Sequence, residues 1–221
     1  LLATSTTTDI TCYGFNDGIA TLTLSGGTGT LIVDWFGMNP SVLSPGTHNY
    51  IVTDINGCPP FNGSVNIIEP ADISVIETIT DVTCNSGNNG TAILTLNGGT
   101  GTLIVDWFGI NPSNLPQGTH PYTVTDASGC SPSVNNSPIT ISEPLAYLPI
   151  FNVNDVMCFG DLTGFIDFTV SGNTPPYTYT WIHGANTQNV EYLAAGTYTV
   201  EVTDSNGCPG SFDATITQPE E

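Results

Sequence analysis

The 221-residue chain contains no lysine and no arginine. Its 20 acidic residues give a formal net charge of −20, and it has no basic side chains of these two types to neutralise phosphates. This argues strongly against nucleic acid as a partner, and anionic lipid surfaces are disfavoured for the same reason. No apolar run approaches the length needed for membrane insertion. Because salt bridges to Lys or Arg cannot form, burial, hydrogen bonds and disulfides must hold the fold.

Motifs for chemistry are also absent. No C-x-x-C pair occurs, which disfavours zinc, and no D-x-D-x-D-G loop marks a calcium site. No Ser-His-Asp arrangement and no Gly-rich phosphate motif stands out. Since an active site is rarely copied several times with its residues changing, we expect that the protein is not an enzyme.

One pattern of residues occurs three times along the chain. Each copy opens with an Asp-x-x-Cys motif and closes with Thr-Asp-x-x-Gly-Cys, followed further on by Glu-Pro or Gln-Pro. The first cysteines of successive copies are 72 and 74 residues apart, which suits a small domain better than a solenoid repeat. We therefore predict three domains, at residues 1–70 (repeat 1), 71–144 (repeat 2) and 145–221 (repeat 3).

Each repeat contains two cysteines, separated by 46, 46 and 50 residues. The pairs are Cys12 with Cys58, Cys84 with Cys130, and Cys158 with Cys208. An even count at a repeated spacing predicts one disulfide inside each repeat, formed in an oxidising compartment. Closing a loop of this length should stabilise the fold by roughly 4 kcal/mol.

The hydrophobic periodicity is two throughout, as in half-buried strands. Alternating runs at residues 20–24, 92–96 and 165–170 each lead to a Gly-rich turn and a strand ending in tryptophan. In repeat 3, Leu-x-x-Gly-Thr-Tyr has the form of a tyrosine corner at Tyr198, where repeats 1 and 2 carry His48 and His120. These features predict an all-β fold of three tandem immunoglobulin-like (PKD-like) β-sandwich modules in an extended rod, on the order of 100 Å long.

The same motifs, taken in order, resemble the SprB repeat of large secreted adhesins of gliding Bacteroidetes. The likeness extends over essentially the whole chain, three times. It implies type IX secretion, display on the cell surface and adhesion, and it offers no catalytic residues to carry over. Repeats 1 and 2 differ from the pattern at His48 and His120, and their connection after the tryptophan is four residues shorter.

Calcium is the one cofactor that the residues suggest, because extracellular proteins bind it through oxygen ligands at module junctions. The recurring candidates are Asp9, Asp81 and Asp155, with Glu69 and Glu143 at the boundaries. The favoured alternative is that each Asp caps a turn and each Glu is simply exposed.

Two other sets of residues invite a functional interpretation. Asp54, Asp126 and Asp204 recur three residues before a glycine, which favours a hairpin turn over a ligand loop. Phe36 and Phe108 directly follow tryptophans and could stack on sugars. The alternative is that the tryptophan points inward and the next side chain outward.

We therefore expect a disulfide-stapled stalk or adhesin rod, non-enzymatic and displayed outside the cell. Its first partners would be neighbouring modules of the same protein. A self-assembling extracellular filament subunit is the first alternative, and an array of carbohydrate-binding modules that recognises surface glycans is the second.

Overall fold

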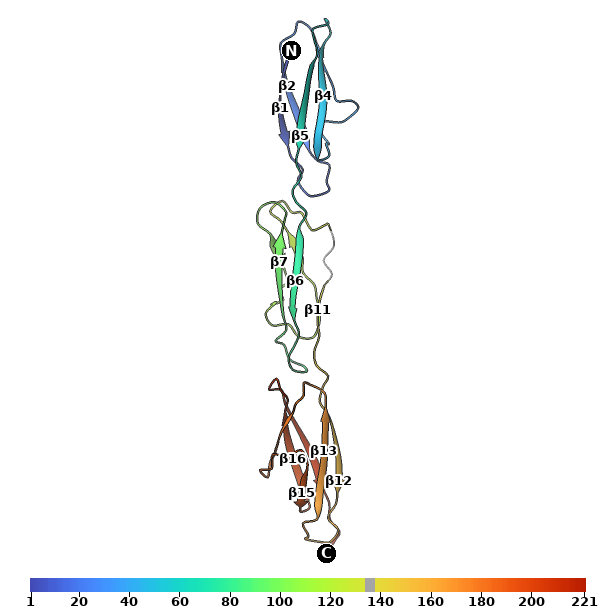
Figure 1. Ribbon diagram of the computed structural model, residues 1–221, viewed down its shortest axis with the longest axis vertical. Coiled ribbons are helices and arrows are strands. Elements are labelled where there is room, and N and C mark those ends of the chain that lie inside the picture. The colour runs from blue at the N-terminus through green and yellow to red at the C-terminus, as the bar shows by residue number, and fades with distance from the viewer. Residues whose placement is uncertain (134–137) are drawn as a thin grey trace. The chain divides into compact units, whose positions relative to one another are not determined.

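The computed structural model describes residues 1–133 and 138–221 and contains only strands and connecting loops in these ranges (Figure 1). The predicted all-β class is confirmed. Within the same ranges, no helix is long and apolar enough to span a membrane.

The strands follow the repeats in sequence. Repeat 1 contains β1 (Leu2–Thr8), β2 (Ile19–Ser25), β3 (Leu31–Asp34), β4 (Gly46–Asp54) and β5 (Phe61–Ile67). Repeat 2 contains β6 (Ser74–Thr80), β7 (Thr91–Asn97), β8 (Ile104–Asp106), β9 (Gly118–His120), β10 (Thr123–Thr125) and β11 (Ile139–Ile141). Repeat 3 contains β12 (Leu148–Asn154), β13 (Gly164–Ser171), β14 (Thr178–Trp181), β15 (Val190–Leu193), β16 (Gly196–Thr203) and β17 (Pro209–Ile216).

The chain forms two compact units. Unit 1 comprises Leu1–Glu77, Leu94–Gly109 and Pro121–Pro138, and unit 2 comprises Thr78–Ile93, Ile110–His120 and Ile139–Glu221. Because this division passes through repeat 2, the three predicted domain boundaries stay a prediction.

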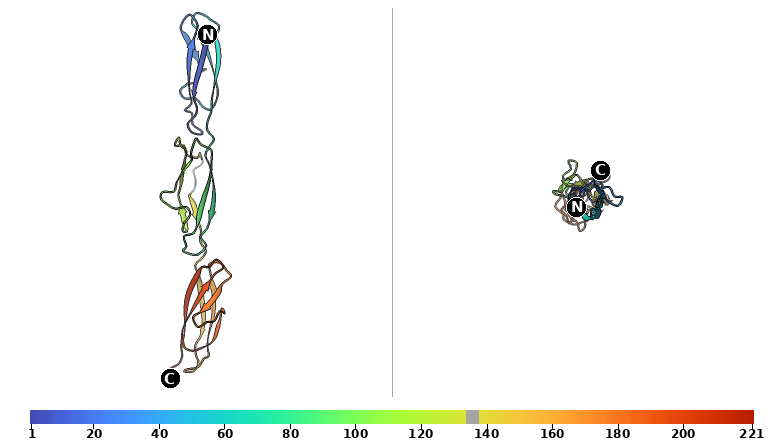
Figure 2. Two further views of the ribbon diagram at one scale, coloured as in Figure 1. Left: turned by 90° about the vertical axis from the view of Figure 1, so that its left-hand side faces the viewer. Right: turned by 90° about the horizontal axis from the view of Figure 1, so that it is seen from above.

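Within unit 2, repeat 3 (orange to red in Figure 2) is a β-sandwich of two antiparallel sheets, whose strand orders are β12-β13-β15 and β14-β16-β17. Alternate residues of β13 and β16 point into one core, which includes Phe168 and Val200. Trp181 is only 1% exposed and packs edge-on against Phe168, with 6.1 Å between ring centroids. The period-two strands and the inward tryptophan confirm the predicted immunoglobulin-like sandwich.

Repeat 1 lies in unit 1. Its strands β1 and β2 form one antiparallel sheet, and β3, β4 and β5 form a second one in that order. Its core includes Trp35, Tyr50 and Val52. Repeat 2 has the equivalent two-stranded pairings β6-β7, β8-β10 and β9-β11. Directly after β8, Trp107 lies 5.1 Å from Tyr122 between ring centroids, as Trp35 directly after β3 lies 5.0 Å from Tyr50.

The predicted corner is present in all three repeats. The Tyr198 hydroxyl donates to the Ala194 carbonyl oxygen at 3.0 Å. His48 Nε2 lies 2.7 Å from the Ser44 carbonyl oxygen, and His120 Nε2 lies 2.9 Å from that of Pro116. Each contact joins residues four apart, so the histidines replace the tyrosine as corner residues.

Candidate functional site

The disulfides join different cysteines from those predicted. Cys12 pairs with Cys130 and Cys84 pairs with Cys208, each with Cα atoms 5.5 Å apart, while Cys58 and Cys158 are free thiols. The predicted pairs Cys12–Cys58, Cys84–Cys130 and Cys158–Cys208 are therefore wrong. Each observed bridge lies within one compact unit and joins consecutive repeats of the sequence.

Strand direction explains why the two cysteines of one repeat do not pair. The Ile10 N–H donates to the Ile68 carbonyl oxygen, which places Cys12 at the end of the sheet where β4 begins and β5 ends. Cys58 follows the other end of β4, a nine-residue strand that spans roughly 26 Å. A disulfide bridges Cα atoms at most about 7 Å apart, so this pair is out of reach.

The calcium candidates of the Asp type accept hydrogen bonds from the backbone. Asp9 Oδ1 accepts from Ile68 N–H at 2.9 Å, and the equivalent bonds are 2.8 Å from Ser142 to Asp81 and 2.7 Å from Thr217 to Asp155. The Thr217 bond holds the pKa of Asp155 below its usual value. These carboxylates tie the start of each repeat to its last strand, as expected of turn-capping residues.

The two glutamate candidates hold the loops of the first cysteines. Glu69 Oε2 accepts from Gly14 N–H at 3.0 Å, and Glu143 Oε2 accepts from Ser86 N–H at 2.6 Å. In repeat 3 the neutral Gln218 takes this role, 3.1 Å from Gly160 N. An amide replacing a carboxylate fits a hydrogen-bond acceptor better than an ion ligand. The described residues include no group of three or more His, Cys, Asp or Glu placed to hold a metal ion.

Asp54, Asp126 and Asp204 are buried acceptors beneath the loops of the second cysteines. Hydrogen bonds from Asn56 N–H and Thr28 N–H, both at 2.7 Å, lower the pKa of Asp54. Each aspartate also begins a turn in which its carbonyl accepts from the glycine three residues later, at 2.9–3.1 Å. The turn interpretation is confirmed.

In repeats 2 and 3 the same aspartate also bonds the cysteine itself. Asp126 Oδ1 accepts from Cys130 N–H at 2.9 Å, and Asp204 Oδ1 from Cys208 N–H at 2.8 Å. Burial raises the pKa of both carboxyls, but the backbone hydrogen bonds that each carboxyl accepts together outweigh it and leave each pKa below its usual value. A charged aspartate therefore orients each half-cystine.

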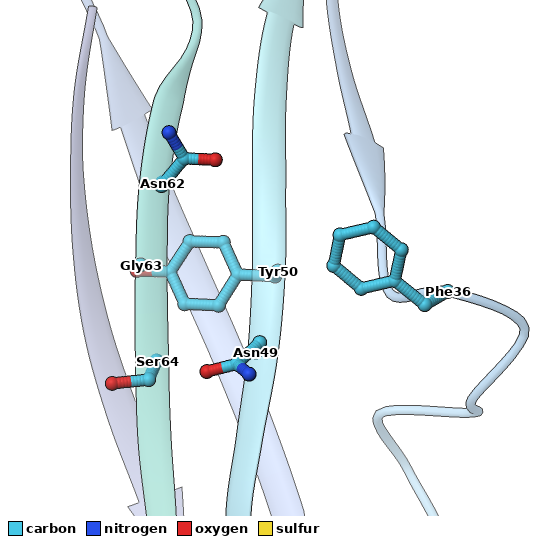
Figure 3. A pocket seen from close by; sticks show the side chains of 6 residues that line it. All are labelled: Phe36, Asn49, Tyr50, Asn62, Gly63 and Ser64. Carbon is cyan, nitrogen blue, oxygen red and sulfur yellow. The ribbon is translucent and has the colours of Figure 1, made fainter.

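An open groove of about 440 Å³ on repeat 1 is lined by two aromatic side chains and several polar ones. Figure 3 shows the Tyr50 ring lying across Gly63, with Asn62 and Ser64 beside it and Phe36 on the other side of β4. An added Cβ at Gly63 would collide with the Tyr50 ring, so only glycine leaves room for it. The sequence signal for this arrangement is weak, because it depends on the β4–β5 register that sets Tyr50 opposite Gly63.

Phe36 is presented to solvent by a tight turn. It is 62% exposed and its φ of 56° lies in the left-handed region, as does that of Gly37, while Met38 N–H donates to Trp35 O at 3.2 Å. Phe108 repeats this with 57% exposure and a φ of 53°. Asp34 and Asp106 each accept from the phenylalanine N–H at 2.7 Å. A bulky residue rarely adopts this conformation, so both turns hold an aromatic ring outward at some conformational cost.

Two segments of the chain match the model of a known family. The family described as the SprB repeat matches residues 4–30 and 150–186. The resemblance drawn from the motifs is confirmed over these segments, while its presence in three copies stays a prediction. No curated protein matches the chain.

Among solved structures, the chain is similar to the crystal structure of Down Syndrome Cell Adhesion Molecule isoform 1.30.30, N-terminal eight Ig domains. The identity is 13% and the TM-score 0.38, and the match covers 86% of this chain and 33% of that one. The chain thus spans about a third of the length of that structure.

Proposed function

From the SprB repeat sequence at residues 4–30 and 150–186, we propose that this extracellular adhesin-type repeat segment serves as a disulfide-reinforced stalk of a cell-surface protein. Its role is mechanical and non-enzymatic: it holds a binding region away from the cell. Export by type IX secretion is part of the proposal and rests on the family resemblance alone.

The observation that carries the proposal is the pairing of cysteines between consecutive repeats. Repeat 1 is joined to repeat 2 by the peptide chain and by Cys12–Cys130, and repeat 2 to repeat 3 by the chain and by Cys84–Cys208. A second covalent link at a junction restricts its bending and prevents its separation under tension. Such a link has special value here, because the chain has no Lys or Arg to form salt bridges.

The bridges also contribute to stability. They close loops of 118 and 124 residues, and the chain-entropy model gives about 5 kcal/mol for each loop of this length. Denaturant unfolding of a Cys12→Ser/Cys130→Ser variant should therefore show a loss of up to about 5 kcal/mol. The matched control, Cys58→Ser/Cys158→Ser, removes the same number of sulfurs and should unfold like the wild type.

A competition assay separates a stalk from the binding part of an adhesin. Purified segment is added to cells that display the parent protein, and attachment to a surface is counted. A passive stalk leaves attachment unchanged at saturating concentration. Inhibition of attachment would show that the segment itself binds the target, and the stalk assignment would be wrong.

A second candidate function, carbohydrate binding, is favoured by the exposed rings. Phe36 stands beside a groove that offers the side chains of Asn49, Asn62 and Ser64, and aromatic stacking with amide and hydroxyl groups is how neutral sugars are held. The charge of −20 disfavours anionic polysaccharides.

A glycan array probed with the wild type and with Phe36→Ala tests this candidate. Signal on neutral glycans should fall when Phe36 is replaced, and should persist in the control Ile32→Ala, which removes another exposed apolar side chain of repeat 1. No signal above background for the wild type would remove the candidate.

A further inference from the structure

The two disulfides follow one rule. The first cysteine of a repeat pairs with the second cysteine of the next repeat, as in Cys12–Cys130 and Cys84–Cys208. Applied to three repeats, the rule leaves one cysteine of each kind free. These are Cys158, the first cysteine of repeat 3, and Cys58, the second cysteine of repeat 1, and they are the two free thiols of the structure. The free thiols are therefore complementary in kind.

The loop around Cys158 already has the conformation of the paired loops. The Cys158 carbonyl accepts from the N–H three residues on at 3.1 Å, as do the carbonyls of Cys12 at 3.1 Å and Cys84 at 3.0 Å. The residue two positions after each cysteine has a positive φ, 78° at Gly14, 59° at Ser86 and 78° at Gly160. Cys158 is thus an exposed thiol held in the geometry that forms a bridge elsewhere in the chain.

The side chains beside Cys158 are apolar and exposed. In unit 1, Tyr13 of the Cys12 loop shares a cavity of about 530 Å³ with Ser128–Ser133 of the loop that carries Cys130. Phe159 occupies the position of Tyr13 and is 52% exposed, close to the 48% of Tyr13, while Met157 beside Cys158 is 81% exposed. These two apolar side chains flank the free thiol where a partner loop would lie.

The Cys58 loop shows the converse arrangement. In repeat 3, the side-chain amide of Asn206 donates to the carbonyl of Thr83, next to Cys84, at 3.4 Å. The same amide also donates inside its own repeat, to Thr174 Oγ1 at 3.1 Å, and the equivalent Asn56 makes this second bond, to Thr28 Oγ1 at 3.3 Å. The turn keeps the bond from Gly57 N–H to the Asp54 carbonyl, at 2.9 Å, as its equivalents do, whereas the bond from the cysteine N–H to the aspartate is found in repeats 2 and 3. The Cys58 thiol and the Asn56 side-chain amide can therefore both contact a loop that carries a first cysteine, as Cys208 and Asn206 contact the loop of Cys84.

We infer that Cys158 of one copy of this chain forms a disulfide with Cys58 of a second copy, so that copies join head to tail. The inference rests on the proposed stapled stalk, which it extends from one chain to a covalent filament. Two different surfaces meet at such a contact, so the assembly does not close on itself as a two-fold dimer does.

The bond requires an oxidant, for which a small-molecule disulfide suffices. One protein thiolate attacks the small disulfide and releases one small thiol, giving a mixed disulfide. The thiolate of the other copy then attacks this intermediate and displaces the second small thiol. The two protein thiols lose two electrons and two protons in total, and the small disulfide is reduced to two thiols.

Two single variants provide the test, with oxidised glutathione as the oxidant at physiological ionic strength. Cys58→Ser retains only the Cys158 thiol and Cys158→Ser only the Cys58 thiol. On a non-reducing gel, each variant alone should stay monomeric, their mixture should form a covalent dimer, and the wild type should form a ladder that disappears on reduction. Covalent dimers of either variant alone, matching those of the mixture, would overturn the inference, as would a wild type that stays monomeric.

Peptide mapping of the same samples separates this inference from the proposed function. A Cys58–Cys158 peptide together with intact Cys12–Cys130 and Cys84–Cys208 peptides supports both. Intact internal bridges without a Cys58–Cys158 peptide would refute the assembly and leave the stalk standing. Loss of the internal bridges would refute the stalk and also the pairing rule on which the assembly depends.

Discussion

Stretched between its two ends, the oxidised chain should reach about a third of the full length that the reduced chain reaches. With both bridges intact, the shortest covalent path runs from Leu1 to Cys12, crosses to Cys130, returns to Cys84 and crosses to Cys208 before reaching Glu221. This path has about 70 peptide steps and a full extension of about 250 Å, because each residue spans at most about 3.5 Å. The reduced chain extends to about 750 Å.

Single-molecule force spectroscopy on Cys58→Ser/Cys158→Ser gives the decisive comparison. The observed pairing predicts that the end-to-end extension of this oxidised variant still reaches its limit at about 250 Å, since neither serine replaces a bridged cysteine. Pairing inside each repeat would leave only Cys84–Cys130 in the variant, and the limit would rise to about 600 Å. A limit near the larger value would refute the assignment of the bridges. The reduced wild type, measured in the same apparatus, calibrates the full length.

Three other predictions concern the sandwiches. Trp181→Ala should destabilise the protein by about 3–5 kcal/mol in denaturant unfolding, because the side chain fills the core of repeat 3, whereas the exposed Tyr192→Ala should change little. Asp204→Ala should cost about 3 kcal/mol, because three backbone N–H groups lose their acceptor. The pKa of Asp204 is lower in the folded state than its usual value of 3.8, so the charged carboxylate contributes fully to the free energy of unfolding above that pH. This contribution is lost as the pH falls below 3.8. Acid titration should therefore destabilise the wild type more than Asp204→Ala. His48→Tyr should retain the corner bond to Ser44 and unfold near the wild type, whereas His48→Ala should lose about 1 kcal/mol; equal losses in both variants would contradict the corner assignment.

The fold was predictable because its signals are local. Alternation over residues 165–170 predicted a strand that the structure places at Gly164–Ser171, with Ile166 and Phe168 in the core. The corner at Tyr198 was predictable for the same reason, because a tyrosine and its acceptor lie only four residues apart.

The disulfide pairing was not predictable from spacing, because spacing gives loop length and not the ends of the sheet at which cysteines lie. In repeat 1 the chain passes along the sandwich three times between Cys12 and Cys58, in β2, β3 and β4, and this leaves the two cysteines at opposite ends. The groove at Tyr50 depends on strand register, which the pattern of residues does not reveal.

Mapping the disulfides of the native, unreduced protein tests the central claim most directly. Proteolysis must use an enzyme that cleaves at acidic or apolar residues, since the chain offers no Lys or Arg. We predict cross-linked peptides that contain Cys12 with Cys130 and Cys84 with Cys208. Peptides that join Cys12 to Cys58 and Cys158 to Cys208 would contradict the account, because no bridge would then cross from one repeat to the next.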